Sequence, residues 1–532
     1  MILRLSAPNK QFESDACQRG PRPSGRIVDN LDPPGNRGST ATLGPTMIRS
    51  CVQKIRSAGS VHVMSLSHTL VGLALLLAAC QADSSAPAEP VTSRSVVFPA
   101  LGAIDAKIES ELQRTGTPGA ALVVVRDGRI VHARGYGLAD VEAPHAADAN
   151  TVWPIASITK VLTAMATMQL VEAGKLSLEK EAATYSKSLR VPDQYDKPIL
   201  VADLLRHTSG LDELPGRRVA RAEDVRPLRE FLSNHLVQHR PPGTLTSYSS
   251  YGMSLAGLLV EELTGSSYAE YVETRIFRPL GMNNSRIMTK RGDERGLAAP
   301  YEIDDGRARR IDYEWYSTPP VASAVSSAMD MGRLLIALTE YTILSRPTLR
   351  SMTATQATLH PSVPGWGYGF QLDSVNGRGV AEHGGDIGGF AGLLVVVPEE
   401  HIGFFIIHHG EGSSLRFTVR QMLLDQLLPG QAAPPAALRG VDLTPYVGSY
   451  RASFTCHTCA KSPPVPEFDV TVNDDALQLW GNRWLPIGKD LFAREDGRAK
   501  LAFVRDDQGH VTMLTGGSWR VGERIIRGEP SK

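Results

Sequence analysis

Two residues three positions apart have the chemical types of a nucleophile and its base. Ser157 and Lys160 form a Ser-x-x-Lys pair within the stretch 155–160. Residues three apart on a helix share a face, and a serine becomes a good nucleophile only when a nearby base takes its proton. The pair therefore predicts an activated serine. The alternative is a helix-capping serine followed by a surface lysine.

The segment after Ser157 predicts the element that holds this pair. Apolar residues recur at helical spacing, at Ile158, Val161, Leu162, Met165 and Met168. This spacing predicts an amphipathic helix that begins at Ser157 and ends near Gly174. A serine at that position lies at the positive end of the helix dipole, which favours an alkoxide or a bound anion.

Two later stretches carry further groups that could take part in chemistry. Tyr248-Ser249-Ser250 stands in a loop that leads into a helix predicted over 251–263. The stretch 383–386, His-Gly-Gly-Asp, begins a β-rich region, where glycines let backbone N–H groups approach a ligand. Each also has an ordinary interpretation: a core tyrosine with a satisfied hydroxyl, a Gly-Gly turn and a surface histidine.

The elements around these stretches predict one sheet that is assembled from both ends of the domain. β-rich runs at 120–125 and 130–133 read as a hairpin, and runs at 393–397 and 402–407 read as a second one. Helices are expected over 101–114 and 414–428. The middle, 175–340, is mostly helical, with helices at 268–278 and at 328–338, the latter capped by Ser326 or Ser327. We therefore predict an α/β fold: an antiparallel sheet flanked by helices, with an inserted all-helical domain.

The remainder of the chain has a different pattern. A linker over 429–440 is followed by short strands over 441–532, which alternate with turns at 473–475, 495–497 and 506–509. This regular alternation predicts a separate, small antiparallel β-barrel.

The order of the three motifs gives a specific resemblance. Ser-x-x-Lys, then Tyr-Ser-Ser, then His-Gly-Gly before paired strands resembles the serine β-lactamase and penicillin-binding protein superfamily. The likeness is greatest to its class C-like branch, which includes esterases and D-amino-acid peptidases. The stretches 135–140, 207–211 and 367–370 support it, and it covers 100–428. The all-β tail, with 446–450, resembles the lipocalin-like domain that often follows this branch.

The resemblance implies a serine hydrolase that needs no cofactor and acts on an ester, amide or β-lactam-like substrate. Ser157 would form an acyl-enzyme, and Lys160 would accept its proton or hold positive charge nearby. Tyr248 would be the second base, which passes a proton to the leaving group; as a phenolate it would need a nearby cation. The backbone N–H groups of Ser157 and Asp386, just past Gly384 and Gly385, would form the oxyanion hole.

Two residues and one short segment depart from the family pattern. Ser250 stands where the family has asparagine, and one hydroxyl replaces an amide donor and acceptor. His383 stands where many relatives carry lysine, so we expect it to meet a substrate carboxylate less strongly, or to hydrogen-bond Tyr248. The segment 321–324 replaces paired glycines and is expected to narrow the cleft. These departures leave the identity of the substrate open.

The N-terminal 100 residues predict an exported protein. The apolar run 70–79 follows basic residues and ends in Leu77-Ala78-Ala79-Cys80, which resembles a bacterial lipobox. We predict a signal over 47–80, lipidation of Cys80, a tether over 81–99 and a membrane-anchored lipoprotein that faces the periplasm. Translation is expected to start at Met47 or Met64, with 1–46 untranslated or disordered. A plain signal peptide or a buried helix is the alternative.

The composition and the missing motifs exclude other classes. The chain has 532 residues, enough for several domains, and 56 basic residues balance 56 acidic ones, which gives no sign of a nucleic-acid partner. The Gly-x-Ser-x-Gly of lipase-type hydrolases and the His-Glu-x-x-His of metalloproteases are absent from the sequence. An inactive lipoprotein that binds peptides or cell-wall fragments stays open as a third reading.

A pair of cysteines in the C-terminal region has its own alternatives. Cys456 and Cys459 form a Cys-x-x-Cys motif, which can be redox-active or can bind zinc. Only His457 is near as a further zinc ligand, and no thioredoxin-like pattern surrounds it. In an oxidising envelope, a local disulfide that pins a loop is the favoured interpretation.

Overall fold

A computed structural model describes residues 101–412, 414–430, 434–459, 467–517 and 521–525. The predicted signal at 47–80 with Cys80, the tether at 81–99 and the stretch 1–46 lie outside the described residues. Within the described ranges, no helix has the length and apolar character needed to span a membrane.

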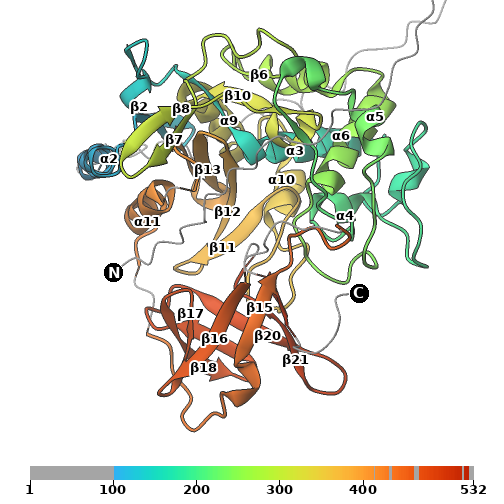
Figure 1. Cartoon of the computed structure of the whole chain (residues 1–532), viewed down its shortest axis with the longest axis vertical. Coiled ribbons are helices and arrows are strands. Elements are labelled where there is room, and N and C mark those ends of the chain that lie inside the picture. The colour runs from blue at the N-terminus through green and yellow to red at the C-terminus, as the bar shows by residue number, and fades with distance from the viewer. Residues whose placement is uncertain (1–100, 413, 431–433, 460–466, 518–520, 526–532) are drawn as a thin grey trace, which may run out of the picture. The chain divides into compact units, whose positions relative to one another are not determined.

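The central element is a seven-stranded antiparallel sheet (Figure 1). Its strands are, in spatial order, β11 (Gln371–Val375), β12 (Arg378–Ile387), β13 (Phe390–Val397), β14 (Ile402–His409), β1 (Gly119–Arg126), β2 (Arg129–Asp140) and β3 (His145–Ala146). The first predicted hairpin supplies β1 and β2, and the second supplies β13 and β14. β1 pairs with β14, for example Leu122 with Ile406, so the two ends of the domain meet in one sheet as predicted.

Helices cover both faces of this sheet. Successive residues of β1 point to opposite faces: Leu122 and Val124 join a core with α2 (Leu101–Thr115) and α11 (Leu415–Leu427). Val123 joins the larger core on the other face, which includes residues of α9 (Ala328–Thr339). Every residue from Gly119 to Val125 is buried. This two-sided burial explains why the strand reads as a continuous apolar run rather than as an alternating one.

The insertion between the two halves of the sheet is built mainly from helices. They are α3 (Thr159–Glu172), α4 (Val201–Leu205), α5 (Leu228–Ser233), α6 (Ser250–Thr264), α7 (Tyr268–Val272), α8 (Pro319–Ala322) and α10 (Arg346–Thr353). Short strand pieces accompany them: β4 (Val152–Pro154), β10 (Ala324–Ser327) and β6 (Arg286–Ile287) in one sheet, β5 (Arg218–Val219) with β9 (Trp315–Tyr316), and β7 (Tyr301–Asp304) with β8 (Arg307–Arg310). Ser327 caps α9, because its side chain accepts the Asp330 N–H.

The C-terminal region forms a closed barrel, which confirms the prediction. Its strands are β15 (Gly448–Ala452), β16 (Glu467–Asn473), β17 (Ala476–Leu479), β18 (Asn482–Gly488), β19 (Leu491–Arg494), β20 (Lys500–Arg505), β21 (Val511–Thr515) and β22 (Val521–Arg524). β15 pairs with β22 and closes the ring. Aromatic residues fill the interior, among them Tyr450, Trp484, Phe492 and Phe503.

One helix differs from its prediction. α3 is not amphipathic: it is buried on almost all sides, from Thr159 through Met168 without interruption. The polar residues in this run bond within the core; the Thr163 hydroxyl, for example, donates to the Pro320 carbonyl at 2.5 Å. A helix that is enclosed all round lies in the interior of a larger domain, so the side chains of α3 meet neighbouring elements rather than water.

Candidate active site

Ser157 lies in a single 3₁₀ turn, Ala156–Ile158 (η1), directly before α3. Ala156 has a φ of +52°, in the left-handed region, where a non-glycine residue costs about 1–3 kcal/mol. The N-cap of α3 is Ile158, which makes no side-chain capping bond. Ser157 therefore does not cap α3, and its side chain instead lines an open cleft.

Lys160 points its amine at this serine. Its Nζ donates to Ser157 Oγ at 3.1 Å and to the Val321 carbonyl at 3.1 Å. The side chain is 1% exposed. Burial lowers the pKa of Lys160 well below its usual 10.5, and the positive charge of Arg217 lowers it further. A lysine whose pKa is lowered is more often neutral, and only the neutral amine can accept a proton.

Tyr248 lies close to the same serine. Its hydroxyl is buried and hydrogen-bonds the Ser157 side chain. Burial raises the pKa of Tyr248 above its usual 10, although the bond to Ser157 acts in the opposite direction. Lys160 Nζ lies 4.8 Å from the centroid of the tyrosine ring. The phenolate that the resemblance implied is thus disfavoured, and Tyr248 rests as a neutral phenol that can give up and regain a proton.

His207 holds the loop that carries Tyr248. Its ring lies 4.7 Å from the Tyr248 ring, its Nδ1 accepts the Ser249 N–H at 3.1 Å, and its carbonyl accepts the Ser247 N–H at 2.8 Å. Burial lowers the pKa of His207 well below its usual 6.5, which keeps the ring neutral and Nδ1 free to accept. The sequence identified 207–211 as a motif, and the structure gives its first residue this supporting role.

The end of strand β12 packs against the region of η1, the turn that carries Ser157. A Cβ added to Gly385 would lie 2.4 Å from the Ile155 carbonyl oxygen, so only glycine allows the strand to approach this closely. Asp386 follows, paired with Ala391 of β13. Gly384 and Asp386 line the same cleft as Ser157. The strand end that the sequence predicted for the oxyanion hole and the candidate nucleophile Ser157 are thus brought together.

Ser250 and His383 lie nearby, but neither reaches out into the cleft. Ser250 is the first residue of α6, and its buried hydroxyl has no hydrogen-bond partner among the described residues. His383 is fully buried, and its Nδ1 lies 2.7 Å from the Gly384 carbonyl oxygen. Burial and the nearby Lys160 lower the pKa of His383 to about 3. At neutral pH it is therefore uncharged and does not offer a cation to a substrate carboxylate.

The segment that replaces the paired glycines has a definite contact. Residues 321–324 are buried, and besides the bond from Lys160 to Val321, the Ala324 N–H donates to Thr159 Oγ1 at 3.1 Å. Thr159 Oγ1 in turn donates to the Ala156 carbonyl at 2.6 Å. The segment thus hydrogen-bonds the first residues of α3 and, through Thr159, is connected to the turn that carries Ser157.

Glu213 and Arg217 also line the cleft, and sequence reasoning missed both. Glu213 accepts the Ser250 N–H at 2.7 Å and pairs with Arg217 at 2.5 Å. Arg217 therefore places a partly compensated positive charge near Lys160 and Tyr248. The one feature of the sequence that could have indicated them is their location, because both follow the motif at 207–211 within a few residues.

Arg416 contacts the end of β12 that carries Gly385 and Asp386. Sequence reasoning missed this residue as well. Its Nη1 donates to the carbonyls of Gly385 at 2.9 Å and Gly392 at 3.1 Å, and its Nη2 pairs with Asp386 at 2.7 Å. The sequence did contain a sign of this role. Arg416 precedes buried Val419 by three positions, so the two share a helix face, and a charged residue on an apolar face needs a buried partner.

We expect Arg416→Ala to lower kcat of the enzyme with little change in KM. Without the guanidinium, the strand end at Gly385–Asp386 loses its anchor, and a small misplacement of a donor costs roughly ten- to a hundredfold in rate. Steady-state kinetics would measure this. Arg420→Ala is the matched control, because Arg420 lies one turn later and pairs with Asp373 and Glu382 instead. Equal losses in both variants would contradict the specific role of Arg416.

Two groups of polar residues near strand ends, Glu382 with Asp386 and His408 with His409, are of types that can bind metals, but they have other partners. Glu382 pairs with Arg420 at 2.5 Å, and Asp386 pairs with Arg416. His409 is enclosed by aromatic rings, among them Trp153 at 4.8 Å. Within the part of the chain that the structure describes, no group of three or more His, Cys, Asp or Glu residues is placed to hold a metal ion.

Comparisons with known proteins identify relatives of this chain. Residues 104–427 match the family model described as Beta-lactamase. The chain is 30% identical over 365 residues to penicillin-binding protein 4 of Amycolatopsis lactamdurans, a match that covers 63% of this chain and 93% of that protein. It is 24% identical over 319 residues to protein flp of Staphylococcus aureus strain MW2, a match that covers 57% of this chain and 62% of that protein.

Solved structures show the same fold. The octameric penicillin-binding protein homologue from Pyrococcus abyssi superposes with a TM-score of 0.54 at 23% identity, over 80% of this chain and all (100%) of that one. D-amino acid amidase from Ochrobactrum anthropi SV3, solved with L-phenylalanine amide, superposes with a TM-score of 0.51 at 23% identity, over 62% of this chain and 97% of that one.

Proposed function

The chain belongs to the β-lactamase family of serine hydrolases, and from this we propose that it hydrolyses an acyl substrate through an acyl-enzyme on Ser157. The observation that carries the proposal is the position of the Lys160 amine, 3.1 Å from Ser157 Oγ and buried. A buried lysine beside a cleft serine has the low pKa and the reach that a general base requires.

In acylation, Ser157 Oγ bonds to the substrate carbonyl carbon and its proton passes to Lys160 Nζ. The carbonyl oxygen becomes an oxyanion, for which the backbone N–H groups of Ser157 and Asp386 are the candidate donors. The bond from the carbonyl carbon to the leaving group then breaks. Tyr248, which hydrogen-bonds Ser157, gives its proton to the leaving group and regains one from Lys160. Water then hydrolyses the acyl-enzyme by the same proton route in reverse.

The surroundings of Ser157 favour an ester or a simple amide over a penicillin. His383 is neutral and buried, so the cation that would meet a β-lactam carboxylate is missing at that position. Ser250 provides one short hydroxyl in place of an asparagine amide. Arg217 carries a positive charge at the cleft, but it is paired with Glu213. We therefore infer a substrate whose recognition does not depend on a carboxylate.

A panel of substrates tests this proposal. The purified full chain is incubated with a p-nitrophenyl ester, a D-amino-acid amide and nitrocefin, and turnover and covalent mass are followed. We expect ester turnover to be fastest and nitrocefin turnover to be slowest. If none is turned over and none leaves an adduct, the chain is instead a binding lipoprotein. A bacterial membrane anchor through a lipid on Cys80 is part of this proposal, and mass analysis of the mature N-terminus tests it.

We expect kcat/KM for the ester to rise with pH along one limb and then to stay level. Lys160 must be neutral to act, and its lowered pKa places the limb well below the 10.5 of an ordinary lysine. Tyr248 must be protonated, and its raised pKa keeps it so through pH values of about 10. A pH–rate profile measures both. A limb centred near the ordinary lysine value, or a fall in rate below pH 10, would contradict these roles.

A further inference from the structure

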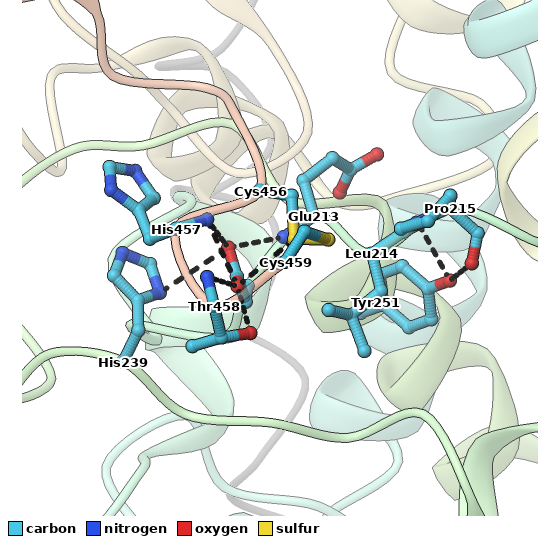
Figure 2. Close-up of a disulfide and its surroundings, with 10 residues drawn as sticks. Glu213, Leu214, Pro215, His239, Tyr251, Cys456, His457, Thr458 and Cys459 are labelled. Carbon is cyan, nitrogen blue, oxygen red and sulfur yellow. Dashed lines mark hydrogen bonds and ion pairs between the residues drawn. A yellow bond between two sulfur atoms is a disulfide. The ribbon is translucent and has the colours of Figure 1, made fainter. Parts of the chain in front are cut away.

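A short segment of the barrel reaches back to the hydrolase domain. We call residues 453–459, which follow β15, the disulfide loop. Cys456 and Cys459 are joined there by a disulfide (Figure 2). The sequence made this pair a candidate for a local disulfide but gave no partner for the loop. In the structure, the partner is the stretch that follows the motif at 207–211.

Asp212 is the main anchor of the disulfide loop. Its carboxylate is fully buried and accepts three donors from the loop: the His457 N–H at 2.9 Å, the Thr458 N–H at 2.9 Å and the Thr458 hydroxyl at 2.7 Å. A buried carboxylate is costly unless such donors replace water. Burial alone would raise the pKa of Asp212, yet bonds from His457 and Thr458 bring it below its usual value. The buried, ionised carboxylate of Asp212 is therefore stabilised only while the loop keeps these donors in place.

Other contacts strengthen the same junction. Ser247 Oγ donates to the Ser453 carbonyl at 2.8 Å. The rings of His239 and His457 stack with their centroids 4.3 Å apart, and Figure 2 shows the two side chains next to each other. Arg240 pairs with Glu523 of the barrel at 2.9 Å. The barrel is thus attached to the hydrolase domain at several points, through the disulfide loop and through Glu523 of β22.

Two of these contacts lie next to residues that flank Tyr248 in the chain or contact its neighbours. Asp212 precedes Glu213, which accepts the Ser250 N–H at 2.7 Å, two residues past the tyrosine. Ser247 immediately precedes Tyr248. The disulfide loop therefore holds the segment before the tyrosine directly, and the segment after it through Glu213.

We propose that the disulfide loop is a positioning device for Tyr248, and that opening the Cys456–Cys459 bond slows the hydrolase reaction. The inference rests on the proposed function. In the chemical step, an external dithiol transfers two electrons and two protons to the disulfide. Two cysteine thiols form, and the dithiol becomes its own disulfide. Cys459 is partly exposed, which gives a small dithiol access. Without the covalent closure, the N–H groups of His457 and Thr458 lose their fixed arrangement around Asp212.

The test follows ester turnover by the full chain before reduction, after reduction with dithiothreitol and after reoxidation. Peptide mass mapping reports the state of Cys456 and Cys459 at each stage. We expect kcat to fall roughly tenfold or more on reduction, with KM little changed, and to recover on reoxidation. The variant in which both cysteines are serine should be slow throughout and indifferent to the dithiol. Circular dichroism checks that the reduced protein remains folded.

A second variant does not involve the cysteines. Thr458→Val removes one donor to Asp212 and leaves the disulfide intact, and it should lower kcat in the same direction by a smaller factor. Ester turnover that is unchanged by reduction, or cysteines that map as free thiols in the untreated protein, would overturn the positioning role. Absence of any turnover or Ser157 adduct in the oxidised protein would instead overturn the proposed function, so the two failures are distinguishable.

Discussion

Replacing Ser157 with alanine should abolish ester turnover, with a loss in kcat of roughly a millionfold, as for the removal of other serine nucleophiles. Ser157 Oγ is the atom that both Lys160 and Tyr248 approach, and an alanine leaves the substrate carbonyl without an attacking atom. Binding should survive, because the cleft keeps its other walls. Steady-state kinetics of the parent protein and the variant, with kcat calculated per mole of total protein, would measure the loss.

Ser327→Ala is the matched control for this experiment. Ser327 caps α9 through the Asp330 N–H, so its loss should cost about 1 kcal/mol in the free energy of unfolding. Turnover should remain near that of the parent protein. If Ser157→Ala kept more than a small fraction of the parent activity, the nucleophile would be another residue.

Replacing Lys160 with methionine should lower kcat by about a hundred- to ten-thousandfold, the range that general-base catalysis supplies. Methionine has a similar length and keeps the site filled, but it cannot take the Ser157 proton. KM should change little, because Lys160 is buried and is not among the residues that line the cleft. Pre-steady-state kinetics would show slow acylation as the cause.

Thermal unfolding adds an independent measurement on this variant. Burying an amine on folding costs free energy because its hydration is lost, whereas burying a methionine side chain is favourable, so Lys160→Met should melt at the same temperature as the parent protein or higher. Lys175→Met, at an exposed position soon after α3, should leave both kcat and the melting temperature unchanged. Acylation by Lys160→Met at a rate near that of the parent would exclude Lys160 as the base.

Local patterns were enough to predict the nucleophile helix, the sheet and the barrel. Ser157 and Lys160 are three apart, and helical geometry alone brings their side chains together. The hairpin around 398–401 and the turns at 473–475 follow from residues that favour turns between apolar runs. These features depend on sequence neighbours, so the sequence contained what was needed.

Tertiary contacts decided what the sequence could not show. α3 was predicted to be amphipathic, but surrounding elements enclose it, so its polar threonines bond inside the core. Arg416 reaches Gly385 and Asp386 across about thirty positions of sequence, and Asp212 meets His457 across far more. The charge state of His383 depends on its burial, which its strand position alone did not reveal. The roles of Ser157, Lys160, Tyr248 and Asp386 in catalysis stay predictions.

The most direct test is the mass of the covalent intermediate. The full chain is mixed with a slowly released p-nitrophenyl ester, quenched in acid and analysed as intact protein and as peptides. We predict one acyl group per chain, carried by Ser157, and none on the Ser157→Ala variant. An acyl group on another residue, or steady turnover with no acylated protein at any time after mixing, would contradict a Ser157 acyl-enzyme.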